Sequence, residues 1–260
     1  MTESLQELWE YRDLFYFLAW RDVKIRYRQT ALGVAWAVLQ PLLATTVFTF
    51  LFGRVAKMPS DGIPYALFSF SAMLPWTYFS TSLSTAANSL VGNAQLIRKV
   101  YFPRMTIPAA AILACMLDFA VGLVILFVMV AYYHAPLSWK FLFWPLLLVQ
   151  LTALTTGISL ILGALNVRYR DIKHATPFAI QILFFLTPII YPVSMIPKRY
   201  RFVISLNPLT GIIETLRSTL FPNRPINLQL CGISLALTLG ILAIGARYFR
   251  RAERAFADMI

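Results

Sequence analysis

Six long runs of hydrophobic residues, separated by short polar segments, dominate the pattern along the chain. They cover residues 34–53, 64–88, 105–133, 141–166, 175–196 and 228–248. Each run is close to or longer than the roughly 20 apolar residues that a helix needs to cross a bilayer. Most runs contain proline, which a spanning helix tolerates where its neighbours resatisfy the freed backbone groups. The pattern therefore predicts an all-α integral membrane protein with six transmembrane helices, some of them kinked.

The composition supports lipid as the solvent. The chain has 260 residues, of which 59% are hydrophobic and 13% charged, and its mean hydropathy is +0.68. Soluble domains average about 45–50% apolar and about 25% charged residues. The net charge of +12 would suit nucleic acid, but the basic residues lie between the hydrophobic runs, as membrane topology requires, so no nucleic-acid partner is expected. Cys115 and Cys231 lie in apolar stretches and are interpreted as packing residues.

The distribution of basic residues predicts the orientation. Six spans place both termini on the same side of the membrane. With the termini inside, fifteen Lys and Arg residues are cytoplasmic and eight are outside. Cytoplasmic loops are enriched in Lys and Arg, so both termini are expected in the cytoplasm of a bacterial inner membrane.

We expect one transmembrane permease domain over 1–260, made of an interfacial segment (1–33), a six-span bundle (34–248) and a cytoplasmic tail (249–260). No cleavable signal peptide is expected, since the longest apolar run before residue 34, Leu14–Trp20, is too short to span. At helical spacing, Leu5, Leu8, Trp9, Phe15, Tyr16, Ala19 and Trp20 share one face of this segment. A helix with such a face lies along a membrane surface, or packs on protein as an ordinary amphipathic helix.

The segment 197–227 contains a further predicted helix. Asn207 is a suitable N-cap, with Pro208 at the first helical position. Apolar residues then recur at helical spacing, and Glu214 and Arg217 can pair three residues apart. This amphipathic helix is expected to dip into the outer membrane face or to line the exit of a pore.

Few residues suggest chemistry within the chain itself. It has no GxxxxGK[ST] phosphate loop, and His134 and His174 do not form a metal-ligand pattern, so no metal site and no catalytic residue are expected. Asp118 is the one carboxylate inside a run, and intramembrane charges are usually functional. Because no second intramembrane acid or base is evident, we expect Asp118 to play a structural role, bonded to hydroxyls or backbone of a neighbouring span.

Two polar segments between runs combine basic and aromatic residues. Basic residues there are required by topology, but exposed aromatics beside arginines are typical of protein interfaces. They predict the docking of a soluble partner. The residues are Leu96, Ile97, Arg98, Lys99, Tyr101, Phe102 and Arg104 in the first segment, and Arg168, Tyr169, Arg170 and Asp171 in the second.

Several segments, in order, resemble the permease subunit of bacterial polysaccharide-exporting ABC transporters of the O-antigen and teichoic acid type. The matching text lies in Ala19–Pro41, Leu96–Pro103, Asn166–Asp171, Thr187–Pro192 and Asn207–Gly211. The resemblance implies six spans, an N-terminal interface helix and short re-entrant helices before the last span. It also implies a homodimer with two copies of a separate ATPase subunit, which would bind ATP and Mg²⁺ and supply the power stroke, so this chain would hold no cofactor.

The resemblance also implies roles for particular residues. Leu96–Arg104 would be a coupling helix on the ATPase, with Arg168–Asp171 a second contact. A lipid-linked polysaccharide would enter from the inner leaflet, and its pyrophosphate could meet Arg21, Lys24, Arg26 and Arg28, although topology explains these cations equally well. Aromatic residues either pack against lipid and helices or line the channel, where sugar rings stack on them. The channel candidates are Trp36, Phe68, Trp76, Tyr78, Phe79, Phe184, Phe185 and Tyr191.

Three alternatives remain at this point. The nearest is a related ABC permease that exports a drug or a small lipid. A membrane-embedded transferase acting on lipid-linked sugar would need a base or nucleophile with acid or metal partners facing it, and no such set of residues is evident in the sequence. An ion-coupled secondary transporter would show internal repeats and several intramembrane charges, which are not evident.

Overall fold

A computed structural model of the chain describes residues 11–28, 35–100, 102–169, 171–222, 224–253 and 256. Within these ranges it contains helices and turns without β-strands, which confirms the predicted all-α class. The elements are α2 (Arg12–Arg28), α3 (Ala35–Phe48), η1 (Thr49–Val55), α4 (Tyr65–Gly92), α5 (Ala94–Lys99), α6 (Thr106–Tyr132), η2 (Trp139–Phe143), α7 (Trp144–Arg168), α8 (Ile172–Leu186), η3 (Val193–Met195), α9 (Lys198–Ser205), α10 (Pro208–Leu220) and α11 (Leu228–Glu253).

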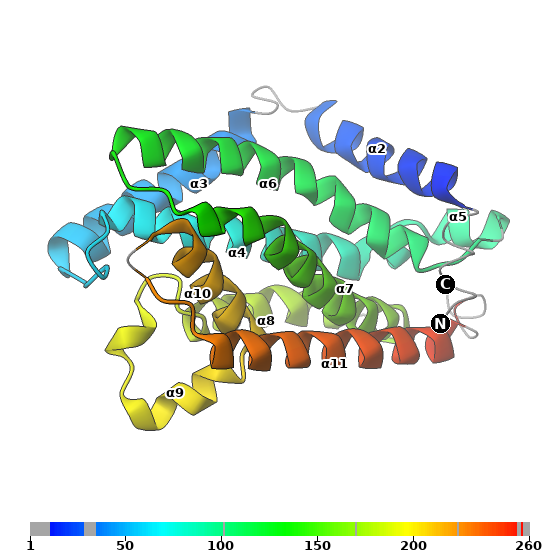
Figure 1. Cartoon of the computed structure of the whole chain (residues 1–260). Helices are drawn as coiled ribbons and strands as arrows, with labels where there is room; N and C mark the ends of the chain where they lie inside the picture. Colours follow the sequence, from blue (N-terminus) through cyan, green and yellow to red (C-terminus); the bar gives the residue numbers. More distant parts are fainter. Residues whose placement is uncertain are drawn as a thin grey trace.

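The long helices form an elongated bundle around α4 (Figure 1). α4 contacts α3, α6, α7, α8 and α10, and most of its side chains are buried. This central position explains why a helix rich in Ser and Thr is stable here: its hydroxyls can bond backbone carbonyls one turn earlier, as Thr85 does to Thr81, instead of facing lipid.

Three helical segments are long and apolar enough to cross a membrane: Thr106–Tyr132, Trp139–Arg168 and Leu228–Glu253. Leu39–Val55 and Ile172–Leu186 are apolar but shorter. All six predicted runs fall on helices, although the predicted fifth span ends early. α8 stops at Leu186 because Thr187 precedes Pro188 and is extended, the conformation that a following proline favours.

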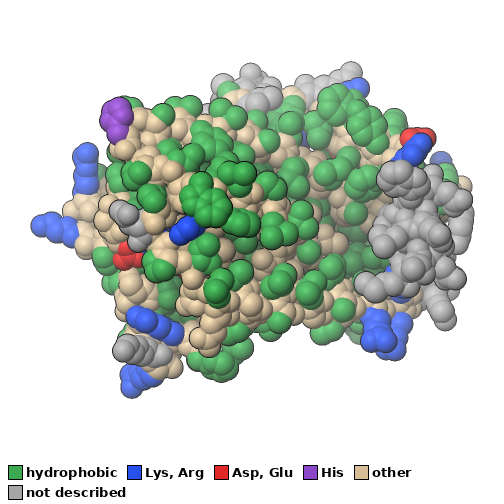
Figure 2. Space-filling model, in the orientation of Figure 1, with side chains coloured by type: hydrophobic (Ala, Val, Ile, Leu, Met, Phe, Trp, Pro, Cys, Tyr) green, Lys and Arg blue, Asp and Glu red, His purple; other side chains and the backbone are tan. Residues whose placement is uncertain are grey.

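Apolar side chains pack in two clusters, one toward each end of the bundle. The smaller cluster joins Leu18 of α2, Ile97 of α5, Leu160 of α7 and Phe249 of α11, and we call this the α5 end. The larger cluster includes Leu209 and Ile212 of α10 and extends through α4, α6 and α7; its far end is called the α10 end. Lys and Arg side chains gather at the two ends of the visible face, and its middle is largely uncharged (Figure 2).

Close helix contact at two glycines joins α7 to α11. A Cβ built on Gly245 would lie 2.2 Å from the carbonyl oxygen of Gly157, and one on Gly157 would lie 2.8 Å from the Cα of Leu242. Both distances are shorter than any real contact, so even alanine would push the two backbones apart. Small residues at such crossings are typical of helix association in membranes.

The predicted helix after Asn207 is present, and its cap is confirmed. The Asn207 side chain accepts a hydrogen bond from the backbone N–H of Leu209 at 3.1 Å, and Arg217 pairs with Glu214. Its expected position, dipping into the outer membrane face or lining the exit of a pore, stays a prediction. α10 packs against α4, α7 and α11, and both of its faces are buried. The hydroxyls of Thr215 and Thr219 bond carbonyls of the preceding turn, whereas the buried hydroxyl of Thr210 has no partner among the described residues.

The N-terminal helix α2 runs beside the first half of α6 (Figure 1). Leu18 and Ala19 are buried against the bundle, whereas Tyr16 and Trp20 are exposed. The predicted apolar face is therefore divided between protein and the outside of the bundle. Leu5, Leu8 and Trp9 lie outside the described residues, and the position of α2 at a membrane surface stays a prediction.

Candidate functional site

The first predicted docking segment forms a short helix and a turn at the α5 end. Ile97 and Phe102 are buried in the apolar cluster of that end, while Arg98 and Lys99 are exposed. Leu96 packs partly against the same cluster, and Tyr101 lies outside the described residues. The segment thus divides into an apolar side that anchors it and a basic side that is accessible.

Arg104 faces the bundle rather than an external partner. Its backbone N–H donates to Glu253 Oε1 at 3.0 Å, and its guanidinium donates to the backbone carbonyl of Glu253. The guanidinium also lies 5.9 Å from the ring centroid of Phe256. Arg104 therefore ties the segment between α5 and α6 to the end of α11, a contact 149 residues away in sequence that no local pattern indicates.

The second predicted contact also lies at the α5 end, where α7 ends. Tyr169 is 49% exposed and the Arg168 guanidinium lies 5.2 Å from its ring centroid. Asp171 is exposed at the start of α8, and Arg170 lies outside the described residues. The exposed part of this end therefore carries the mixture of cations and aromatic rings that the sequence predicted.

The three candidate pyrophosphate cations whose side chains are described, Arg21, Lys24 and Arg26, do not form one group. Arg21 bonds the carboxylate of Asp22 at 2.8 Å and the side-chain oxygen of Asn93 at 2.9 Å. Lys24 is exposed, with its ammonium 5.6 Å from the ring centroid of Trp20. The Arg28 side chain is not described. Of the three described side chains, only Arg26 contacts the middle of α6.

Arg26 and Tyr27 converge on Asp118, half-way along α6. The Arg26 guanidinium forms an ion pair with one carboxylate oxygen, and the Tyr27 hydroxyl donates to the other. A second guanidinium nitrogen lies 3.2 Å from Cys115 Sγ. The prediction that Asp118 bonds hydroxyls or backbone of a neighbouring span is corrected: its partners are a cation and a hydroxyl, both from α2, which precedes the first predicted span.

Burial and the bond to Asp118 raise the pKa of Tyr27 above its ordinary value. The phenol therefore remains a neutral donor, and the carboxylate is satisfied by a cation and a hydroxyl together. Such pairing is what makes a charge at this depth tolerable, because an unpaired ion in an apolar surrounding costs several kcal/mol or shifts to its neutral form.

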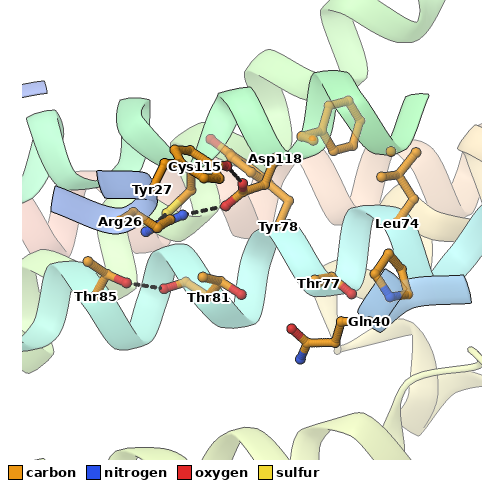
Figure 3. Close-up of a pocket in the computed structure, with 13 residues that line it drawn as sticks. Arg26, Tyr27, Gln40, Leu74, Thr77, Tyr78, Thr81, Thr85, Cys115 and Asp118 are labelled. Carbon is orange, nitrogen blue, oxygen red and sulfur yellow. Dashed lines mark hydrogen bonds and ion pairs between the residues drawn. The ribbon is translucent and has the colours of Figure 1, made fainter. Parts of the chain in front are cut away.

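A cavity of about 340 Å³ opens beside this ion pair, between α2, α3, α4 and α6. Figure 3 shows Arg26, Tyr27 and Cys115 gathered at Asp118, with Tyr78 rising from α4 toward them and Thr81 and Thr85 following along α4. Tyr78 was a channel candidate from the sequence. Thr81 and Thr85 belong to the hydroxyl-rich part of α4.

Most of the aromatic channel candidates lie inside the protein. Phe68 and Phe79 are fully buried, and Trp76 packs with its ring centroid 5.3 Å from that of Phe184. Phe184 and Tyr191 are half-buried, and Phe185 is 62% exposed. The side chain of Trp36 is not described. Phe68 and Phe79 contact only protein, and among the candidates whose side chains are described Phe185 has the largest exposed surface. A channel role for all eight stays a prediction.

Arg217 is a buried cation, for which the sequence predicted only a pairing with Glu214 on the same helix. Its guanidinium donates to the carbonyls of Pro188 and Ile189, both at 2.7 Å, and to that of Phe68 at 3.2 Å. It also pairs with Glu214 at 3.0 Å and lies 3.7 Å from the ring centroid of Phe68. α10 is thereby fastened to α4 and to the turn after α8.

The comparisons with known proteins fit this arrangement over the whole chain. Residues 13–221 match the family described as ABC-2 type transporter. The O-antigen export system permease protein RfbA of Klebsiella pneumoniae is 30% identical over 252 residues, 95% of each chain. The protein of the same name from Myxococcus xanthus is 29% identical over 263 residues, all of both chains. The polysialic acid transport protein KpsM of Escherichia coli is 25% identical over 244 residues, 90% of this chain and 92% of its own.

The family match covers most of the chain, and the similarity to these relatives extends from end to end without a large insertion or missing part. The resemblance that the sequence motifs suggested is therefore confirmed at the level of the family. The chain belongs to the ABC-2 type transporter family of membrane proteins.

Proposed function

We propose that the chain is the permease subunit of an ATP-driven exporter that moves a lipid-linked polysaccharide out of the cytoplasm. The observation that carries this proposal is the near full-length similarity to permeases named for O-antigen export and polysialic acid transport. The three long apolar helices support a membrane location, which for such a protein is the bacterial inner membrane.

The energy would come from a separate ATPase subunit. The chain has no phosphate loop, so ATP and Mg²⁺ would bind in that partner. The partner would dock at the α5 end, where Arg98, Lys99 and Tyr169 offer accessible charge and aromatic surface over an anchored core. Arg104 would contribute by holding this surface to α11 instead of touching the partner.

Two copies would assemble as a homodimer with the channel between them, and two ATPase subunits would complete the transporter. Support comes from exposed apolar side chains on the two shorter apolar helices: Leu43 and Val47 on α3, and Phe178 and Phe185 on α8. In this arrangement six segments cross the membrane, α2 lies at its inner surface, and both termini are cytoplasmic.

Deleting the gene and restoring it on a plasmid tests the function directly. The surface polysaccharide should disappear and return, and a tagged chain should copurify with an ATPase whose hydrolysis is stimulated by lipid-linked glycan. Unchanged surface polysaccharide in the deletion strain would refute the proposal. Export of a drug or small lipid in its place would favour the related ABC permease.

The docking surface has its own test with a matched control. Replacing Arg98 and Lys99 by Glu reverses the exposed charge and should abolish copurification of the ATPase. The same replacement at Arg199, exposed on α9, should leave it intact. Normal copurification of the first variant would exclude this surface.

The pyrophosphate role of the N-terminal cations is tested by changing Arg21, Lys24, Arg26 and Arg28 to Gln together. Unchanged export at normal membrane levels would remove that role. Because Arg26 is bound to Asp118, a second variant that keeps Arg26 and changes the other three separates ligand binding from the packing of α2.

A further inference from the structure

We propose that the cavity between α2, α3, α4 and α6 binds one saccharide unit of the exported molecule within a single copy of the chain. The inference rests on the proposed function and adds to it a specific site, distinct from a channel between two copies. The cavity holds about 340 Å³, within the range of roughly 300–1,000 Å³ that is typical of small-molecule sites. A polymer would not fit, but a single ring would.

The polar groups of the cavity are arranged on two sides. One side carries the ion pair of Arg26 with Asp118. On the other side, Thr77, Thr81 and Thr85 follow one another at intervals of four residues, so their hydroxyls line one face of α4. Figure 3 shows these threonines along α4, with Tyr78 rising from the same helix beside the ion pair.

Several of these groups have free hydrogen-bonding capacity. In the described part of the chain, the hydroxyls of Thr77 and Thr81 and the amide of Gln40 have no hydrogen-bond partner, although all three side chains line the cavity. Thr85 donates its proton to the carbonyl of Thr81 and keeps its oxygen lone pairs available. Gln40 is exposed, and Thr77 and Thr81 are partly buried, so all three groups can bond water or a polar ligand that enters the cavity.

The charge of the site favours a neutral ligand. Arg26 and Asp118 already neutralise each other, so an added anion would face the carboxylate and an added cation would face the guanidinium. A sugar ring carries hydroxyls that both donate and accept and no charge. It can accept from Gln40 and Arg26 and donate to Asp118 and Thr85.

The remaining walls suit the other face of a ring. Leu74, Phe119 and the ring of Tyr78 line the cavity, so apolar and aromatic surface stands next to the polar groups. A pyranose has the same division, with C–H groups on its faces and hydroxyls around its rim. A few placed polar groups in a largely apolar pocket are the usual composition of a specific site.

The first test removes one hydroxyl without changing shape. Thr81→Val should lower export of surface polysaccharide several-fold at normal membrane levels, and Gln40→Leu should do the same. Thr156→Val is the matched control, since Thr156 on α7 bonds only a carbonyl of its own helix and lies outside the cavity. Normal export in both cavity variants would overturn the proposal.

The second test detects occupancy. Thr81→Cys and Ala56→Cys, the latter exposed near the α10 end, are each treated in cells with methyl methanethiosulfonate, and the unsubstituted chain gives the background from Cys115 and Cys231. The comparison is between cells that make the lipid-linked glycan and cells lacking the enzyme that starts it. Modification of Thr81→Cys should be several-fold slower when glycan is made, whereas Ala56→Cys should react equally in both.

Equal modification of Thr81→Cys in the two strains means a water-filled cavity and overturns the inference, as does no modification in either strain. The deletion experiment keeps the two proposals separate. If deletion removes surface polysaccharide but glycan does not protect Thr81→Cys, only the saccharide site fails; if deletion leaves the polysaccharide unchanged, the export function fails first.

Discussion

Arg217 and Arg26 are two arginines inside the bundle with different surroundings. Arg217 is fully buried, and its guanidinium is used by three backbone carbonyls, a carboxylate and a ring. The side chains of Arg26 and Asp118 are each 26% exposed and border a cavity lined by groups with spare hydrogen-bonding capacity. The comparison teaches that a buried cation bonded by several backbone carbonyls holds helices together, whereas an ion pair that borders a polar cavity can also contact a ligand.

The largest effect is expected from removing the fully buried Arg217. Arg217→Met fills similar volume but leaves three buried carbonyls without their donor and Glu214 with only the longer ion pair to Arg224, which should lower the free energy of unfolding by about 3–5 kcal/mol. Little protein should reach the membrane, as measured by immunoblotting and by melting temperature in detergent. Arg199→Ala, an exposed site at the same end, is the control; a stable Arg217→Met chain would show that α10 does not depend on this residue.

Charge reversal at Arg26 should have a smaller but still clear effect. Arg26→Glu places two carboxylates together, and because the pair is partly exposed we expect a loss of about 1–3 kcal/mol in stability. The double variant Arg26→Asp with Asp118→Arg should recover most of the melting temperature. Failure of the swap to recover it would mean that the pair contributes something other than opposite charge.

Tyr27→Phe sharpens the comparison further because it keeps the ion pair and removes one donor. The loss should be about 1 kcal/mol, since Asp118 remains bonded to Arg26. The melting temperature in detergent measures this change. A loss of stability as large as that of Arg26→Glu would mean that the Tyr27 hydroxyl, and not the ion pair of Arg26, contributes most to holding α2 on α6.

The smallest change is expected at Arg21, whose bonds to Asp22 and Asn93 are partly exposed. Arg21→Gln should cost less than about 1 kcal/mol of stability, because exposed ion pairs contribute little. Melting curves of this variant and of Arg26→Glu, recorded side by side, rank the two cations. Equal losses would contradict the distinction between them.

Local sequence patterns predicted the helices well, because each depends on neighbours in the chain. Hydropathy located the long helices, and Asn207 with Pro208 marked the start of α10. The pair of Glu214 with Arg217 followed from helical spacing.

Contacts between distant segments could not be predicted in this way. Arg26 meets Asp118 across 92 residues, and Arg104 meets Glu253 across 149. Arg217 also binds carbonyls of the turn after α8, which no side-chain pattern indicates. The cavity is likewise formed by four helices, so the threonines of α4 signal it only after the fold is known.

The contact of Gly157 with Gly245 also fixes the register of two helices. If α11 slid along α7 by one residue, Ile244 or Ala246 would occupy the position where even a single Cβ is too close. The contact therefore permits only one register of α11 against α7. A displacement of α11 at the α5 end must therefore move α7 as well or separate the two helices. We expect α7 and α11 to move as one rigid body during transport.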